Sequence, residues 1–111
     1  MKRIVVRFYR TDSGSEPVRD WLLTLDKSDK LAIGEDIKTL EFGWPKGMPV
    51  CKALGSGLYE VRSHLSAGRI SRVLFCIMDN NMILLHAFIK KTQKTPEKEL
   101  DLARTRKRSL K

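Results

Sequence analysis

Acidic residues are scarce in this sequence, with 13 Asp and Glu against 22 Lys and Arg, which leaves a formal net charge of +9 at pH 7. The sequence therefore has few residues that could form a carboxylate pair for general acid–base chemistry, and no candidate pair stands out. The motifs of common cofactor enzymes are missing too, because the sequence contains no P-loop, dinucleotide fingerprint, HExxH helix or CxxC pair. We expect no metal and no cofactor, and the basic charge favours a polyanionic partner such as RNA, DNA or an acidic protein.

Long apolar runs are absent as well. No stretch approaches the roughly 20 residues that span a membrane, and the N-terminus has too few apolar positions for a signal peptide. Cysteine is limited to Cys51 and Cys76, and Cys51 has no neighbouring His or second Cys that would suggest a metal site. We expect a cytoplasmic protein with two reduced thiols, Cys76 in an apolar strand and Cys51 in a loop.

The length of 111 residues suits one domain, residues 1–111, with a single hydrophobic core. Residues 3–9 mix β-branched and aromatic side chains, which predicts a first strand. A helix is predicted from about Pro17, because apolar residues then recur at the spacing of one helical face. These residues are Val18, Trp21, Leu22 and Leu25.

A second helix is predicted from Ser28-Asp29, which can cap it, to about Phe42. Residues 44–57 are rich in proline and glycine and predict a long loop. Thr95 can cap a last helix, which has only a narrow apolar stripe. With three strands between the loop and this helix, the order of elements predicts an α+β fold with a mainly antiparallel four-stranded sheet.

Those three strands span residues 58–65, 70–78 and 82–91, and turn residues separate them. A three-residue loop at 66–68 would pair Arg62 with Arg72. In the second hairpin, Asn80-Asn81 suits the two positive-φ positions of a type I′ turn. That turn would set Arg72 opposite Ile89.

This register predicts a cationic patch on one face of the sheet. Because side chains alternate along a strand, His64 would share the face of Arg62, and Lys91 that of Arg72. Directly opposed like charges destabilise an antiparallel pair, so a sheet has reason to avoid them unless an anion binds there. The alternative is a merely solvated strand rim, as expected for many cations in so basic a chain. A one-residue slip in either hairpin would move half of the patch to the other face.

Further cations lie in loops and in the C-terminal tail, where they can follow a phosphate backbone. The tail charges can equally complement the dipole of the last helix, and a loop lysine can simply be solvated. The candidates for RNA or ribosome binding are Lys46, Lys52, Lys94, Arg104, Arg106, Lys107 and Arg108.

Three runs together resemble the phage-derived, HigB-like branch of the RelE toxin superfamily, and the resemblance extends from Trp21 through the final helix. The runs are LYEVR at 58–62, SRVLF at 71–75 and LHAFIKKTQKTP at 85–96. The resemblance implies a RelE-like fold and a toxin of a type II toxin–antitoxin system. It also implies an antitoxin partner that usually carries a helix-turn-helix domain, and metal-independent cleavage of mRNA on the ribosome.

By position, the resemblance implies functional roles for Arg62, Arg72, Lys90 and Lys91, with His64 near another functional position. The chain lacks the aromatic residue that some members have after the last strand, so the resemblance does not identify a general base. Cutting RNA requires attack of the 2′-OH on the adjacent phosphate, cations for the phosphorane and an acid for the departing oxygen. The guanidinium groups suit the phosphorane, and on face geometry we favour Lys91 and His64 for proton transfer.

Two other functions fit the same sequence. One is a toxin of this fold that binds a protein target, such as a topoisomerase, and performs no chemistry. The other is an RNA-binding or ribosome-associated module. Catalysis distinguishes them, since only a nuclease produces new RNA ends.

Overall fold

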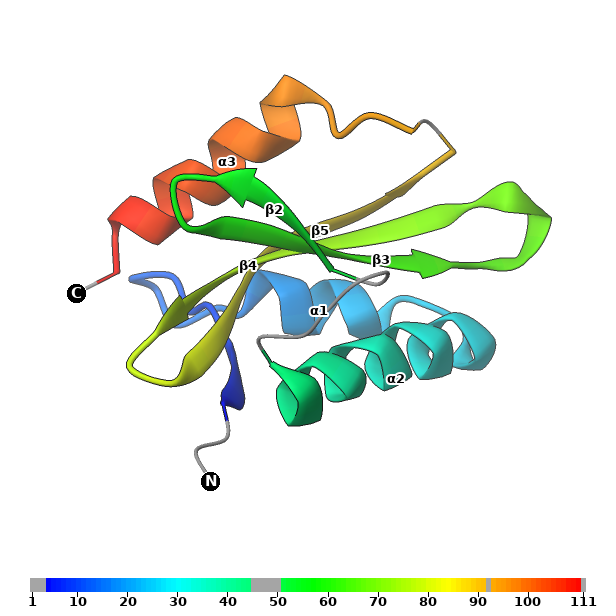
Figure 1. Ribbon diagram of the computed structural model, residues 1–111, viewed down its shortest axis with the longest axis horizontal. Helices are drawn as coiled ribbons and strands as arrows, with labels where there is room; N and C mark the ends of the chain where they lie inside the picture. The colour runs from blue at the N-terminus through cyan, green and yellow to red at the C-terminus, as the bar shows by residue number, and fades with distance from the viewer. Residues whose placement is uncertain (1–3, 45–50, 92, 111) are drawn as a thin grey trace.

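The computed structural model describes residues 4–44, 51–91 and 93–110, which form an α+β structure (Figure 1). Along the described chain, one strand is followed by two helices, four more strands and a final helix. The predicted α+β class is therefore confirmed. None of the described helices combines the length and the apolar character needed to cross a membrane.

The described strands form one five-stranded mixed sheet in the order β1-β5-β4-β3-β2. The strands are β1 (Val5–Phe8), β2 (Cys51–Gly55), β3 (Leu58–His64), β4 (Ile70–Met78) and β5 (Asn81–Lys90). Strands β2 to β5 pair in antiparallel fashion, whereas β1 runs parallel to β5.

The prediction of four strands was wrong because β2 lies within the stretch expected to be a loop. Its sequence, CKALG, has no β-branched or aromatic residue and so gives little strand signal. Antiparallel pairing with β3 holds this segment in a strand conformation, with Cys51 opposite Val61 and Lys52 opposite Glu60. Cys51 is accordingly a buried residue of an edge strand and not part of a loop.

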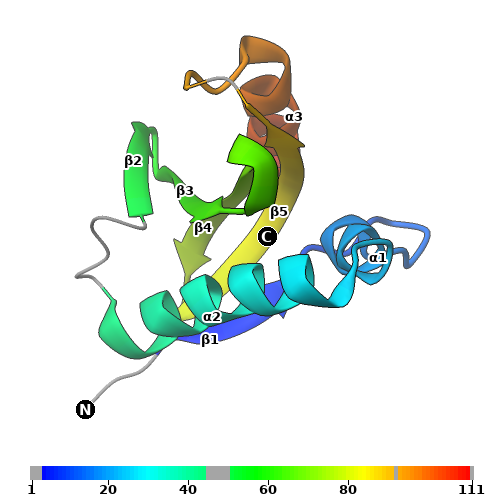
Figure 2. The ribbon, with the colours of Figure 1, turned by 90° about the vertical axis from the view of Figure 1, so that its right-hand side faces the viewer.

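Helices α1 (Pro17–Leu23) and α2 (Lys27–Gly43) cover one face of the sheet, and α3 (Glu97–Arg108) covers the other (Figure 2). The N-cap of α2 is Asp26 and not Ser28-Asp29, because the Asp26 carboxylate accepts the backbone N–H of Asp29 at 3.0 Å. The expected cap of α3 is also wrong. Pro96 is its N-cap, and the Thr95 hydroxyl donates to a carboxylate on β3.

The sheet separates two apolar clusters. The larger one lies against α1 and α2, and it contains the buried apolar residues of α2, which are Ile33, Ile37 and Leu40. The smaller one lies against α3 and includes Leu58, Leu74, Cys76, Leu85, Phe88 and Ala103. One free thiol lies in each cluster, so the apolar setting predicted for Cys76 is confirmed.

The two hairpins differ in how well their register was predicted. Arg62 pairs with Arg72 as expected, because the loop after β3 has the expected length. In the second hairpin, the positive-φ residues are Asp79 and Asn80 and not Asn80-Asn81. The pairing of β4 with β5 shifts once more between Leu74 and Phe75, and the two shifts together set the observed register.

As a result, Arg72 faces Phe88 and not Ile89. The shift arises because β5 has one extra residue, Leu85, at this point of the pairing. Side chains alternate along β5, so Phe88 and Lys90 share the face of Arg72, and Lys91 does not.

Candidate functional site

Nine positions of β3, β4 and β5 form a grid on the face of the sheet that α3 covers. Its three rows are Glu60-Leu74-His86, Arg62-Arg72-Phe88 and His64-Ile70-Lys90. Neighbouring strands lie about 4.8 Å apart, so residues at the two ends of a row have backbones about 10 Å apart. The grid therefore brings cations of β3 and β5 to one surface, with Arg72 at its centre.

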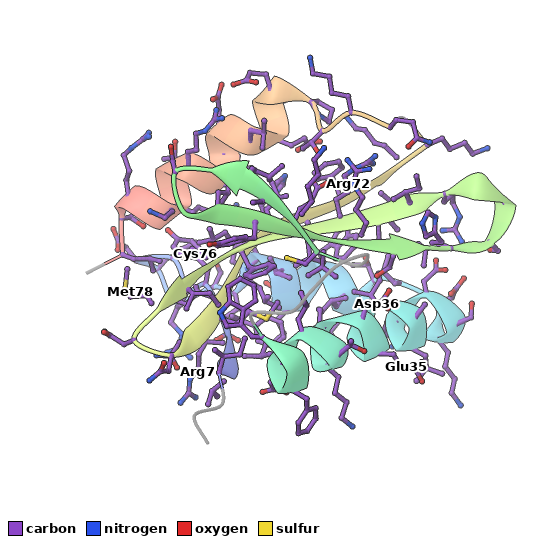
Figure 3. All side chains as sticks on the ribbon, in the orientation of Figure 1. Arg7, Glu35, Asp36, Arg72, Cys76 and Met78 are labelled. Carbon is purple, nitrogen blue, oxygen red and sulfur yellow. The ribbon has the colours of Figure 1, made fainter. Side chains whose placement is uncertain are left out.

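The arginine pair in the middle row has one buried and one accessible member. Arg72 is 0% exposed, and Figure 3 shows it on the side of the sheet that faces α3. The side chain of Arg62 is 21% exposed. Burial, followed by the charge of Arg62, lowers the pKa of Arg72, whereas Glu60 opposes both effects. A ligand arriving from solvent therefore meets the Arg62 guanidinium, and Arg72 lies beneath it.

A buried carboxylate that the sequence analysis missed lies beside this pair. Glu60 is 0% exposed and accepts hydrogen bonds on both oxygens. Nε of Arg62 donates to Oε2, and the Thr95 hydroxyl donates to Oε1 at 2.6 Å. Nη2 of Arg62 also donates to the backbone carbonyl of Gln93 at 2.9 Å. The i, i+2 spacing of Glu60 and Arg62 was the available sequence signal, because such residues share one face of a strand.

A pocket of about 350 Å³ lies next to this network. Its lining comes from β2, from the segment before α3 and from α3 itself: Lys52, Leu54, Gln93, Lys94, Thr95 and Leu100. Lys52 and Lys94, two of the cations predicted to bind RNA, thus lie at one pocket although far apart in sequence. Lys52 also pairs with Glu60 across the strands, which places the pocket directly beside the top row of the grid.

A second polar cluster connects β5 to α3. The Glu99 carboxylate contacts Nε2 of His86 at 2.7 Å and Nζ of Lys90 at 3.3 Å. Burial alone would raise the pKa of Glu99, but the hydrogen bonds with His86 and Lys90 outweigh it and leave this pKa below its ordinary value. Phe88 joins the two clusters, since Nζ of Lys90 lies 5.7 Å and Cζ of Arg72 6.0 Å from its ring centre. Neither His86 nor Glu99 was among the predicted site residues.

The two residues favoured for proton transfer lie differently from expectation. His64 is exposed at the end of β3, and alternation puts it on the face of Arg62, as predicted. Lys91 is exposed beyond the end of β5, and the observed register puts Lys90 in its place on the face of Arg72. The geometric reason for choosing Lys91 was therefore wrong. A catalytic role for either residue stays a prediction.

Several predicted RNA-binding cations gather at the other end of α3. A pocket of about 240 Å³ is lined by Ser56, Leu58, Arg104, Lys107 and Arg108. Arg104 is also paired within the helix, where Nη1 contacts Glu97 at 2.8 Å and Asp101 at 2.9 Å. Lys46 lies outside the described residues.

Arg106 makes structural contacts of its own. Its Nη1 donates to the backbone carbonyl of Leu85 at 2.7 Å, and its guanidinium carbon lies 5.7 Å from the centre of the Tyr9 ring. Burial lowers the pKa of Arg106. These contacts tie α3 to the irregular part of β5, so Arg106 has a role in the fold besides the predicted one.

A comparison with known protein families finds a match that covers most of this chain. The model described as Phage derived protein Gp49-like (DUF891) matches residues 20–108. The matched range contains every residue of the grid, the lining of the two pockets described above and the whole of α3. No curated protein matches the chain.

Proposed function

The chain belongs to the phage-derived Gp49-like family, and from this membership and its basic site we propose that it is the toxin of a type II toxin–antitoxin system, cutting mRNA on the ribosome. The observation that carries the proposal is the meeting of Lys52, Arg62 and Lys94 beside one pocket. These cations come from three separate segments, so local sequence alone does not account for their convergence. The resemblance of the strand sequences to RelE-superfamily toxins supports the same function.

In the proposed reaction, the Arg62 guanidinium binds the scissile phosphate. Its planar group matches two phosphate oxygens and keeps its charge at any physiological pH. Arg72 is too deeply buried to touch RNA in this conformation, so it contributes through its positive field. Lys52 and Lys94 hold neighbouring phosphates, because binding along a strand requires several cations in succession.

Proton transfer is assigned to His64 and Lys90, which stand at opposite ends of one row of the grid. The 2′-oxygen forms a bond to phosphorus while the bond from phosphorus to the 5′-oxygen breaks. His64 accepts the proton of the 2′-OH, and the Lys90 ammonium protonates the departing 5′-oxygen. The products are a 2′,3′-cyclic phosphate and a 5′-hydroxyl end. A backbone spacing of about 10 Å lets the two side chains approach one phosphate from opposite sides.

The partners in this proposal are the ribosome with its mRNA and an antitoxin that carries a helix-turn-helix domain. The net charge of +9 favours both kinds of partner, since ribosomal RNA and acidic protein segments are each attracted to a basic surface. The compartment is then the cytoplasm, where translation takes place.

Induced expression followed by sequencing of 5′-hydroxyl RNA ends tests the proposal. We expect growth arrest and new ends within translated messages for the wild type, and neither for Arg62→Ala. Arg19→Ala is the matched control, because this arginine is exposed on α1, on the other side of the sheet. Purified protein that has been stripped of bound metal with EDTA and then freed of the chelator should also cut ribosome-bound mRNA.

Other outcomes would replace this proposal with one of its alternatives. Growth arrest without new RNA ends would favour a toxin that binds a protein target. Ribosome binding with neither arrest nor new ends would favour a binding module.

A further inference from the structure

A carboxylate buried among cations is the feature that the proposed chemistry leaves unused. Glu60 is 0% exposed, and burial of an ionised group is costly unless hydrogen bonds and opposite charges satisfy it. Here the two carboxylate oxygens have different donors, Arg62 on one and Thr95 on the other. Glu60 therefore connects the central strands of the sheet to the segment that leads into α3.

We propose that Glu60 is a positioning residue, which fixes the Arg62 guanidinium relative to the pocket wall formed by Gln93 and Thr95. This inference rests on the proposed cleavage of RNA, in which Arg62 holds the scissile phosphate. Glu60 itself touches no substrate. It acts through Arg62 and through the hydroxyl of Thr95.

Two contacts on different atoms fix the plane of the Arg62 guanidinium. Nε donates to Glu60, and Nη2 donates at 2.9 Å to the carbonyl of Gln93, a residue that also lines the pocket of about 350 Å³. A planar group held at two of its nitrogens has little freedom to rotate. The orientation of the fork toward a phosphate is thus set before the substrate arrives.

The opposed arginines explain why this position needs a carboxylate. Arg62 and Arg72 face each other across β3 and β4, and like charges so placed repel. Glu60 precedes Arg62 on the same strand face and counters the repulsion from a fully buried position. Glu60 also acts against the lowering of the Arg72 pKa, as expected if its negative charge offsets the repulsion between the two arginines.

Removal of the carboxylate should therefore affect the chemical step more than binding. Lys52, Lys94 and the charge of Arg62 all remain, so affinity for the ribosome persists. The guanidinium loses its fixed orientation, and a displacement of about 1 Å in a catalytic group can cost about a hundredfold in rate. We expect Glu60→Gln to lower kcat for cleavage by about a hundredfold and to change KM by less than about threefold.

Glu60→Asp separates position from charge. Aspartate keeps the negative charge beside the arginines but is one methylene shorter, so it cannot span both Arg62 and Thr95. A positioning role predicts that Glu60→Asp also loses at least about tenfold in kcat. If charge alone matters, Asp restores the wild-type rate, and the inference is overturned.

A double-mutant comparison addresses a purely structural role. If Glu60 acts through Arg62, then Glu60→Gln should lower no further the residual single-turnover cleavage rate of a purified protein that already carries Arg62→Ala. Equal losses in both backgrounds would overturn the inference. Melting curves for each variant show that the rates are compared between folded proteins.

An NMR measurement makes the inference testable without any nuclease assay. In the wild type, the Nε–H signal of Arg62 should be protected from exchange and shifted downfield, because a charge-assisted hydrogen bond holds this proton. Both features should weaken in Glu60→Gln, whose amide oxygen is an uncharged acceptor, and should disappear in Glu60→Ala, which has no acceptor. If they persist, the positioning role is refuted whatever the RNA assays give. If they disappear while the wild type cuts no RNA, the positioning of Arg62 stands and only the proposed function fails.

Discussion

Arg106 offers a test of whether a cation of the C-terminal tail serves the fold or the RNA. Its guanidinium donates to the Leu85 carbonyl at 2.7 Å and lies over the Tyr9 ring. Leu85 is the extra residue of β5, where the regular pairing with β4 is interrupted. A carbonyl at such an irregular point depends more than others on a partner outside the ladder. We therefore expect Arg106→Met to destabilise the protein.

The size of the effect follows from the two contacts. A hydrogen bond from a charged donor contributes about 1.5–3 kcal/mol, and a cation–π contact at a partly exposed site about 0.5–1 kcal/mol. Arg106 is only half-buried, which favours the lower part of each range, and methionine refills much of the space of the aliphatic stem. The expected loss is about 2 kcal/mol, which corresponds to a fall in Tm of about 8 °C for a chain of this length.

Urea unfolding of Arg106→Met and Arg108→Met provides the measurement. Arg108 lies on the same helix but is exposed, and its Nη2 donates to the Thr105 hydroxyl at 3.2 Å. Its substitution should change the free energy of unfolding by less than about 0.5 kcal/mol. If both variants unfold at the same urea concentration and lose ribosome binding equally, then Arg106 is an ordinary surface cation. The reasoning from its contact with Leu85 would then be refuted.

Two further predictions concern titratable groups. Because the folded-state pKa of Glu99 lies below its ordinary value of 4.5, its contribution to stability is present above that value and is lost as pH falls through the lower folded-state pKa. The urea midpoint should therefore decrease less steeply with falling pH, below about pH 4.5, in Glu99→Gln than in the wild type. An equal pH dependence in both proteins would contradict the pairing of Glu99 with His86 and Lys90. Burial raises the pKa of Cys51 and Cys76, so both thiols should react with a thiolate-specific reagent at least about tenfold more slowly in the native protein than in urea. Rapid native labelling of either one would reveal local opening around it.

The sequence was sufficient where local geometry decides the structure. The loop of Ser66, Ala67 and Gly68 has a length that permits one pairing, so the opposition of Arg62 and Arg72 was predictable. The second turn was not, because Asp79, Asn80 and Asn81 all belong to residue types that tolerate positive φ. The choice among them depends on how β5 packs, and one extra residue in β5 then decides which lysine joins the patch.

Buried polar contacts were beyond the reach of pattern reasoning. A Thr-Pro step before a helix predicts a cap, yet the Thr95 hydroxyl donates to Glu60. The hydroxyl has a hydrogen-bond partner both as a helix cap and as a donor to Glu60, and only the packing of the segment against the sheet decides between them. Glu60 was missed for a related reason, since an acidic residue in a strand is ordinarily placed in solvent. In this protein its neighbours are arginines that need an opposite charge.

The parallel pairing of β1 with β5 has a consequence for the order in which the sheet forms. Strands β3, β4 and β5 are joined by short turns, so they can pair soon after they are synthesised. Val5 pairs with Asn81, and about two-thirds of the chain lies between them, so β1 can join only after a large loss of chain entropy. The N-terminal strand must therefore wait for the last strand to be made. We expect β1 to dock late in folding and to detach early when the native protein opens locally.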